Sequence, residues 1–172
     1  MTLRALGLGP LLIGAVLTLG SCAYSTSTAN LPPHLRTISI PAFENQTSET
    51  SLQQELTDAV VNRFVTDNHL KVVDERSANS VLRGVIRSYR NSVFGISADT
   101  RSEEYRVTIE VSVTFKDLVK NREVWKDEGL VKTSNYYVQT VPGQEAKTEL
   151  DGRKAAIAKI ADEILSCTVE SW

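Results

Sequence analysis

Histidines and neighbouring carboxylates are the side chains with which this chain could perform acid–base or metal chemistry. His34 and His69 lie 35 positions apart, outside any HExxH motif or Cys-rich cluster, so we expect them to be solvated rather than metal ligands. Asp127 and Glu128 are adjacent on an expected strand and point to opposite faces, so they cannot both flank one substrate bond. No GxSxG, P-loop or GxGxxG motif follows residue 21. The sequence predicts no catalytic residue, no metal site and no cofactor.

Arginines grouped in the middle of the chain could recognise an anion. Five of them bracket an expected turn near Tyr89 and Phe94: Arg83, Arg87, Arg90, Arg101 and Arg106. They could form the charged, solvated outer face of a sheet. Alternatively, some contact an anionic lipid headgroup, because a guanidinium pairs with a phosphate through two hydrogen bonds. The candidate contacts with a partner or with lipid are Arg87, Tyr89, Arg90, Phe94, Arg101 and Arg106.

Cys22 could carry a covalent modification. It follows Arg4, an uncharged run from Ala5 to Leu19 and the small pair Gly20-Ser21, as in a secretory signal with its cleavage site. A cysteine directly after this site resembles the lipobox of bacterial lipoproteins, in which the thiol receives a diacylglycerol and the new amine is acylated, for instance with palmitate. A membrane-spanning helix needs about 20 apolar residues, and this run is shorter. We therefore expect residues 1–21 to be a lipoprotein signal peptide and Cys22 to be the lipid attachment site.

Length and charge limit what the remaining chain can be. Removal of residues 1–21 leaves 172 − 21 = 151 residues, which suits one domain with a hydrophobic core. The loss of Arg4 leaves 18 Lys and Arg against 21 Asp and Glu, a net charge of 18 − 21 = −3. A nucleic-acid-binding protein would show a basic excess, so no nucleic-acid partner is expected. One further cysteine, Cys167, gives no disulfide framework, and its role stays open.

The domain is expected to begin after a tether. Residues 22–33 are small, hydroxylated and turn-prone, and the 11 residues after Cys22 span at most about 36 Å when fully extended. Hydrophobic periodicity divides the domain, residues 34–172, into strands over 35–43, 70–74, 81–89, 105–116 and 123–133 and helices over 51–67 and 148–167. The strand at 105–116 is the clearest, because apolar and polar residues alternate throughout. Ser51 and Gln54 resemble a capping box for the first helix.

One apolar sheet face and two amphipathic helices bury each other most simply as two layers. We therefore predict an α+β two-layer sandwich, in which two helices pack on one face of a mainly antiparallel sheet of four to five strands. The first two strands and the helix between them would form a right-handed crossover if those strands pair in parallel.

A series of short motifs carries a family resemblance. The run ISIPAFENQT at 38–47 is followed by Glu55-Leu56-Thr57 to Phe64, Leu70 to Val73, Ala78 to Ile86, Tyr105-Arg106-Val107 and Glu123-Val124-Trp125. In this order, from the signal peptide to about Leu130, they resemble LptE-type lipopolysaccharide-assembly lipoproteins, which open with I-x-I-P-x-F-x-N-x-T. The opening phrase alone also resembles that of CsgG-type secretion pores. Asn45 and Thr47 match the motif, and either a loop-shaping role or a contact with a barrel explains them.

The resemblance implies an assembly role rather than an enzyme. LptE-type proteins sit on the periplasmic face of the cell outer membrane and plug an LptD β-barrel, where they help lipopolysaccharide reach the outer leaflet. The implied partners are an LptD-like barrel and lipopolysaccharide. Ala23 directly follows the expected lipidated cysteine. In lipoproteins generally, a residue other than Asp at this position favours export to the outer membrane. The alternative, a CsgG-like oligomeric secretion or pore-associated lipoprotein, needs a membrane-spanning hairpin, and the polar run Asn91 to Ser102 argues against one.

Overall fold

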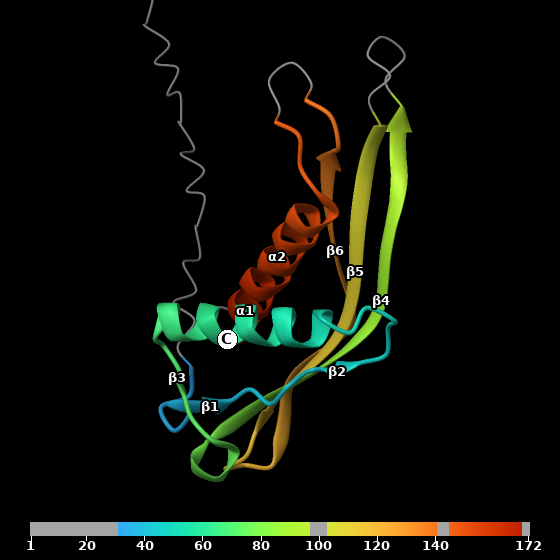
Figure 1. The fold of residues 1–172 in the computed structure, drawn as a ribbon. Helices are drawn as coiled ribbons and strands as arrows, with labels where there is room; N and C mark the ends of the chain where they lie inside the picture. The colour runs from blue at the N-terminus through green and yellow to red at the C-terminus, as the bar shows by residue number, and fades with distance from the viewer. Residues whose placement is uncertain (1–30, 97–102, 141–144, 170–172) are drawn as a thin grey trace, which may run out of the picture.

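The elements follow the order expected from hydrophobic periodicity, and they form one sheet with two helices (Figure 1). The computed structural model describes residues 31–96, 103–140 and 145–169. The elements are β1 (Thr37–Ser39), β2 (Glu44–Asn45), α1 (Leu52–Asp67), β3 (Lys71–Val72), the short 3-10 helix η1 (Glu75–Ser77), β4 (Ser80–Ile96), β5 (Glu103–Asp117), β6 (Arg122–Tyr137) and α2 (Glu149–Val169).

The sheet is mixed, with a long antiparallel half and a short parallel half. Its strand order is β3-β1-β4-β5-β6, and β2 also pairs with β4, which makes six strands. β4, β5 and β6 are antiparallel neighbours, whereas β1 pairs in parallel with both β3 and β4. We call the end where β4 leaves and β5 enters the sheet the tip, and the end that holds η1 and the β5–β6 turn the base (Figure 1). The predicted α+β sandwich is confirmed.

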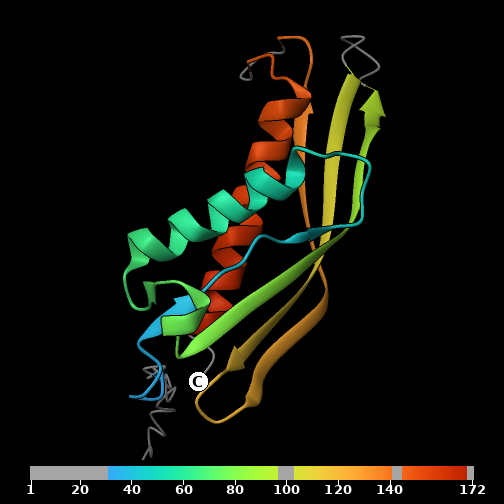
Figure 2. The same cartoon turned by 60° about the horizontal axis from the view of Figure 1, so that its bottom comes forward.

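The core lies between one sheet face and both helices. Along β5 every second residue from Val107 to Phe115 is at most 1% exposed. The buried side chains of α1 recur every fourth residue, at Leu52, Leu56, Val60 and Phe64, and so form one stripe. α2 adds Ile160 and Ile164, and the two helices cross on the same side of the sheet (Figure 2). Each such side chain stabilises the fold by about 1.5–3 kcal/mol through burial.

The strand boundaries differ from the prediction in both directions. β1 ends at Ser39 because Pro41 has no N–H with which to extend the ladder, and pairing resumes only in β2. β4 continues to Ile96, seven residues beyond the expected end at Tyr89. Its polar residues Asn91 and Ser92 are exposed yet paired with β5, because backbone hydrogen bonds rather than side-chain burial hold them there.

The predicted capping box at the start of α1 is wrong. Ser51 has helical backbone angles and makes no side-chain cap, and its hydroxyl donates instead to Glu49 Oε1 at 2.8 Å. α1 ends at Asp67 and is capped by Asn68, whose φ of 60° is left-handed and whose N–H donates to the Phe64 carbonyl oxygen.

The sheet face opposite the helices is polar, and we call the part of it formed by β4, β5 and β6 the open face. Alternation along β5 places on it the residues Arg106, Thr108, Glu110, Ser112 and Thr114. No described helix covers this face (Figures 1 and 2). Within the described ranges, no helix is both long and apolar enough to span a bilayer.

Candidate functional site

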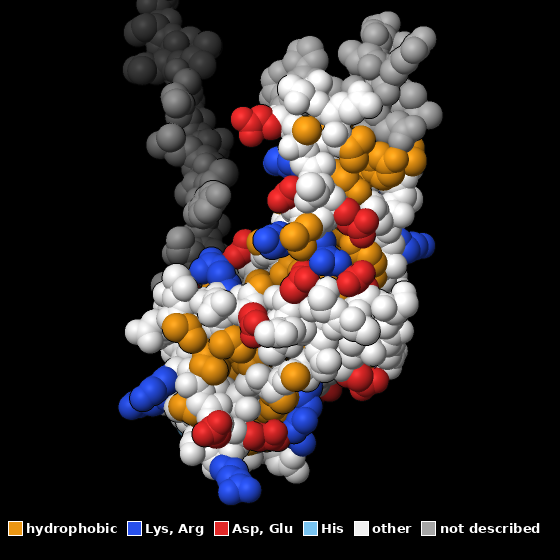
Figure 3. Space-filling view, in the orientation of Figure 1, with side chains coloured by type: hydrophobic (Ala, Val, Ile, Leu, Met, Phe, Trp, Pro, Cys, Tyr) orange, Lys and Arg blue, Asp and Glu red, His pale blue; other side chains and the backbone are white. Residues whose placement is uncertain are grey.

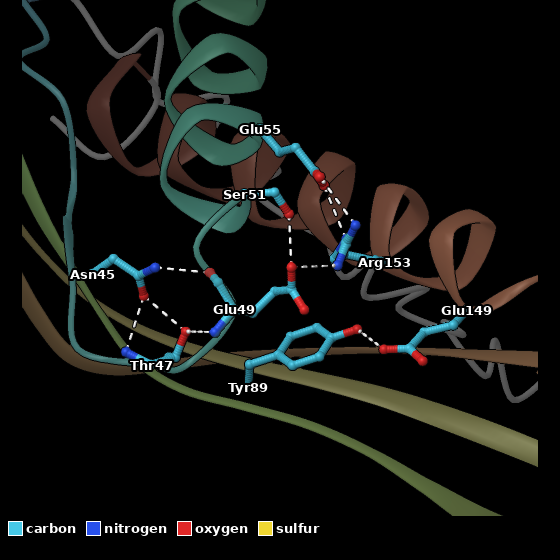
Figure 4. A network of polar contacts seen from close by, with 8 residues as sticks. All are labelled: Asn45, Thr47, Glu49, Ser51, Glu55, Tyr89, Glu149 and Arg153. Carbon is cyan, nitrogen blue, oxygen red and sulfur yellow. Dashed lines mark hydrogen bonds and ion pairs between the residues drawn. The ribbon is translucent and has the colours of Figure 1, made fainter.

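The loop that enters α1 is held by its own side chains, and we call residues 44–51 the motif loop (Figure 4). Asn45 Oδ1 accepts hydrogen bonds from the Thr47 N–H at 3.0 Å and from the Thr47 hydroxyl at 2.8 Å. Asn45 Nδ2 donates to the Glu49 carbonyl oxygen at 2.8 Å. This Asx turn supplies the hydrogen bonds of the loop from within. Asn45 and Thr47 therefore shape the loop, which is the first of the two roles that the sequence suggests for them.

Arg153 on α2 ties the motif loop to both helices (Figure 4). Its guanidinium lies 3.3 Å from Glu49 Oε1 and 3.0 Å from Glu55 Oε2, and it donates a hydrogen bond to Glu55 Oε1 at 3.1 Å. The Arg153 side chain is only 13% exposed. Burial alone would lower the pKa of Arg153, but the charges of Glu55 and Glu49 outweigh it and raise that pKa. The cation therefore remains charged inside this cluster.

Tyr89 enters the same network from β4 (Figure 4). Its hydroxyl donates to Glu149 Oε1 at 2.5 Å, and the Arg153 guanidinium lies 6.0 Å from its ring centroid. Burial and the hydrogen bond to the Glu149 carboxylate raise the pKa of Tyr89 above its ordinary value. Tyr89 thus points toward the helices and away from the open face, where its neighbouring arginines lie.

Phe43, the residue before the motif loop, holds the start of this loop against α1 and β4. Its ring is fully buried, its N–H donates to Thr57 Oγ1 at 3.1 Å, and its carbonyl oxygen accepts from Gln53 Nε2 at 2.7 Å. The ring lies directly against Gly84 of β4, where a Cβ atom would come within 2.0 Å of Phe43 Cε1. Only a glycine leaves room for this approach.

Near the tip, the exposed Phe94 and the half-buried Arg106 form a pair on the open face. The Arg106 guanidinium carbon lies 3.2 Å from the Phe94 ring centroid, and the Phe94 side chain is 50% exposed. Arg106 Nε donates to Asn135 Oδ1 at 2.8 Å, and Asn135 Nδ2 donates to Glu104 Oε1 at 2.7 Å. Figure 3, seen from the side of the helices, also shows hydrophobic side chains gathered over this end of β4 and β5. The tip is therefore both apolar and cationic.

Two further predicted arginines share the open face with Arg106. Arg87 donates to Gln46 Oε1 at 3.0 Å and to Ser112 Oγ at 3.2 Å. Arg90 is exposed, and the β4–β5 register makes it a diagonal neighbour of Arg106. Within the described part of the chain, none of these three arginines has a carboxylate oxygen within ion-pair distance. Such a row can bind a phosphate or carboxylate group.

Two of the predicted site residues, Cys22 and Arg101, lie outside the described residues. The described ones divide between two places. Arg87, Arg90, Phe94 and Arg106 lie on the open face, whereas Tyr89 belongs to the network under the helices.

Sequence reasoning missed Arg153 and the pair formed by His34 and Asp117. Arg153 meets Glu49 across 104 positions of sequence, so no local pattern announces the contact. The expectation of a solvated His34 is wrong, because its Nε2 atom lies 2.8 Å from Oδ2 of the fully buried Asp117. The position of Asp117 at the start of a turn could have indicated that its side chain is held in place, since an Asp there commonly accepts N–H groups of the turn.

Within the described ranges, no group of three or more His, Cys, Asp or Glu side chains is arranged to hold a metal ion. The described residues thus form a partly buried network around Arg153 and a group of arginines on the open face that have no carboxylate within ion-pair distance. Guanidinium groups of this kind can bind a phosphate or carboxylate group.

Comparison with solved structures shows similar folds. Protein XCC0632 from Xanthomonas campestris is 13% identical with a TM-score of 0.58, over 82% of this chain and 90% of that chain. Protein CT253 from Chlamydia trachomatis is 12% identical with a TM-score of 0.50, over 76% and 94%. Rare lipoprotein B from Shewanella oneidensis is 20% identical with a TM-score of 0.49, over 77% and 95%. At such identities the likeness concerns the fold alone.

Comparison with sequences is decisive at the level of the family. No curated protein sequence matches the chain significantly. The family model for LptE, described as lipopolysaccharide-assembly, matches residues 35–166. That match spans most of the chain and includes the motif loop, the described open face, α1 and most of α2. The protein therefore belongs to the LptE lipopolysaccharide-assembly family.

Proposed function

We propose that the protein is an outer-membrane lipoprotein, anchored through acyl groups on Cys22 at the periplasmic face, that acts as the plug and assembly subunit of a lipopolysaccharide translocon. Its partner is an LptD-like β-barrel. The single observation that carries the proposal is the LptE family match over residues 35–166. The lipobox pattern ending at Cys22 supports the anchor.

The open face supports the role of a plug. The interior of an outer-membrane barrel is polar, so a protein inside it needs a polar outer surface. On β5 the open face presents only charged and hydroxylated residues between Arg106 and Thr114. The 16 residues of β6 extend over about 54 Å at about 3.4 Å per residue, which is enough to reach deep into a lumen.

The uncompensated arginines support a contact with lipopolysaccharide or with acidic residues of the barrel. Arg90 and Arg106 are diagonal neighbours near the exposed Phe94, neither has a described carboxylate oxygen within ion-pair distance, and two like charges so placed repel each other. An anionic group placed between them would relieve this repulsion. Arg87 and Arg101 complete the set of candidate contacts.

The first test is co-purification of the full-length, acylated protein from membranes in mild detergent. We expect a large β-barrel protein to come with it, and mass spectrometry should find acyl chains on Cys22 and no leader. Depletion of the protein should leave lipopolysaccharide on the inner side and destabilise the barrel. Recovery of no barrel would overturn the proposal.

A second test separates the open face from the helix layer. The double variant Arg90→Ala/Arg106→Ala should lower the amount of lipopolysaccharide at the cell surface while leaving the thermal unfolding midpoint unchanged. The matched control is Arg63→Ala, which removes an arginine of α1 that pairs with Asp162 at 2.5 Å on the helix side. Equal transport by both variants and the wild type would exclude the arginines from the contact.

The CsgG-like alternative remains an outcome of the first test. β4 and β5 form a longer hairpin than expected, but beyond Tyr89 only seven residues of β4 remain. A strand that crosses an outer membrane needs about 9–11 residues. A ring of copies without a barrel, seen by microscopy, would favour this alternative.

A further inference from the structure

We propose that the tip half of β4 accepts an extended segment of the barrel partner as an added strand. We call residues 88–93 of β4 the free edge. The inference rests on the proposed function and deepens it, because it names the surface and the chemistry by which the plug holds the barrel. The added segment carries an acidic side chain on the face that it shares with Arg90 and apolar side chains on the other face.

Beyond Ile86, one side of β4 has no neighbouring strand among the described residues. β1 and β2 line this side nearer the base, and β2 pairs last at Ile86. The Gln46 N–H donates to the Ile86 carbonyl oxygen at 3.0 Å, and the motif loop then leaves for α1 (Figure 1). From residue 88 to residue 93, β4 pairs with β5 on its other side. An added strand would therefore continue the row that β1 and β2 begin.

The free edge has the length and the regularity that strand pairing needs. Register shifts between Ile86 and Ser88 and between Val93 and Gly95 mark irregular points, and the pairing with β5 is regular between them. Six regular residues span about 20 Å, which is a common strand length in globular proteins. Alternate residues of an edge strand turn unpaired N–H and C=O groups outward, where another strand can bind them.

The opposite edge of the sheet is occupied by the chain itself. On β6, the Thr133 carbonyl oxygen accepts a hydrogen bond from Lys159 Nζ of α2 at 2.7 Å. The Tyr137 carbonyl oxygen accepts one from the Lys147 N–H, also at 2.7 Å. A strand added to β6 would have to displace both contacts. The free edge of β4 requires no such displacement by the described residues, so it is the better place for an added strand.

The open face determines the charge of the added segment. The β4–β5 register places Ser88, Arg90 and Ser92 on this face. Arg90 is exposed, and within the described residues it has no carboxylate oxygen within ion-pair distance, although Glu110 lies opposite Ser88 on β5. Side chains directly opposite each other on paired strands lie about 4.5–5.5 Å apart at their Cβ atoms. An acidic residue opposite Arg90 would therefore form a cross-strand ion pair.

The inner face of the free edge determines the other side of the added segment. Val93 is 50% exposed on the side of the helices, and its neighbour Tyr105 on β5 stacks on Tyr136 with ring centroids 5.5 Å apart. Hydrophobic side chains gather at this end of the sheet (Figure 3). Apolar side chains of an added strand would cover Val93 and remove its surface from water. Backbone hydrogen bonds would supply the affinity, and the two faces would supply the specificity.

The barrel can supply such a segment without opening its wall. All backbone groups of the strands in a closed barrel are already paired, so the segment must come from a loop or a chain end that enters the lumen. Strand addition near the tip then fastens the plug from inside the lumen. It leaves the polar open face beside the free edge available to lipopolysaccharide.

Photocross-linking in cells tests the register of this pairing. The full-length acylated protein carries p-benzoylphenylalanine in place of Ser88 or of Ser92, which lie four residues apart on the open face. We expect both positions to cross-link to one barrel segment, at residues about four apart, because paired strands advance together. Val131 and Asn135, four apart and exposed on the β6 edge, are the matched control and should show no such spacing. Cross-links scattered over unrelated barrel segments, or none from 88 and 92, would overturn strand addition.

A peptide probe tests the chemistry on the detergent-solubilised, full-length acylated protein. The probe is a capped, fluorescent nine-residue peptide that alternates Glu and Val. Arg90→Ala and Val93→Lys should each weaken its binding up to about fivefold, whereas the control Val131→Lys, at a valine that is 46% exposed on β6, should not. A peptide with Lys in place of Glu should bind more weakly, and one methylated at every peptide nitrogen should not bind. Equal binding of the methylated peptide would exclude backbone pairing.

The two proposals fail in different ways. If a barrel co-purifies but the cross-links from 88 and 92 show no common spacing, strand addition is wrong and the plug role stands. If no barrel co-purifies, the proposed function is wrong. Regular cross-links to a protein that is not a barrel would then keep the free edge as a binding surface and exclude the barrel as its partner.

Discussion

The substitution Gly84→Ala tests the joint between the motif loop and the sheet. The added methyl carbon would lie 2.0 Å from Cε1, 2.3 Å from Cδ1 and 2.7 Å from Cζ of Phe43. The ring cannot retreat, because it is fully buried and its backbone is hydrogen-bonded to Thr57 and Gln53 of α1. Either β4 or the motif loop must move by more than 1 Å at the centre of the core (about 3.4 Å being an ordinary contact).

Overpacking of this kind costs about 1–3 kcal/mol and occasionally more. Because both sides are clamped, we expect the free energy of unfolding to fall by about 3 kcal/mol. For a domain of this size that corresponds to a thermal midpoint lowered by roughly 6–12 °C. Urea unfolding followed by circular dichroism measures the first quantity and a thermal scan the second.

A control and a double variant make the test specific. Gly129→Ala on β6 is the matched control, since no heavy atom lies within 4 Å of its added carbon, and we expect a change within about 0.5 kcal/mol. Phe43→Ala alone should cost about 3–5 kcal/mol, and adding Gly84→Ala to it should cost nothing more. The reasoning is refuted if Gly84→Ala behaves like Gly129→Ala or if the two costs at 43 and 84 simply add.

Three further predictions concern charges and the anchor. Burial alone would raise the pKa of Asp117, but hydrogen bonds from the Lys120 N–H and His34 outweigh it and lower that pKa, so its stabilisation is present above about pH 4 and is lost as the pH falls below that. Urea titrations at pH 7 should show Asp117→Asn less stable by about 2 kcal/mol, with the difference shrinking in acid. Arg153→Met should cost about 2 kcal/mol, because it leaves two partly buried glutamates without their cation, whereas Lys154→Met should be silent in the same titration. Cys22→Ser should release the protein from the membrane fraction, and its retention there would exclude the anchor.

The fold was largely predictable because its strongest patterns are local. The strict alternation from Tyr105 to Lys116 can satisfy only a strand with one buried face, and β5 is that strand. The two helices likewise follow from their apolar stripes. Strand ends were less predictable, since Asn91 and Ser92 in β4 are held by pairing with a neighbour that the local sequence does not specify.

The candidate site was predictable as a group of arginines but not as a surface. A bulge between Ile86 and Ser88 adds one residue to β4, which changes the alternation of the side chains that follow. Arg87 and Arg90 thereby reach the same face, while Tyr89 turns toward the helices and meets Glu149. A bulge leaves no reliable mark in a single sequence, so the separation of Tyr89 from its arginine neighbours required the structure.

The residues that carry the family resemblance are occupied with holding the fold together. Phe43 fills the space over Gly84, and Asn45 and Thr47 satisfy the loop that leads into α1. Side chains that make these internal contacts are not available to bind a partner. The motif therefore indicates the fold and does not indicate which partner the protein binds. We therefore expect partner contacts on surfaces that the motif leaves out, and the open face is one such surface, because neither Arg90 nor Arg106 has a described carboxylate oxygen within ion-pair distance. Substitutions on that face should therefore change transport without changing stability, and substitutions in the motif should do the reverse.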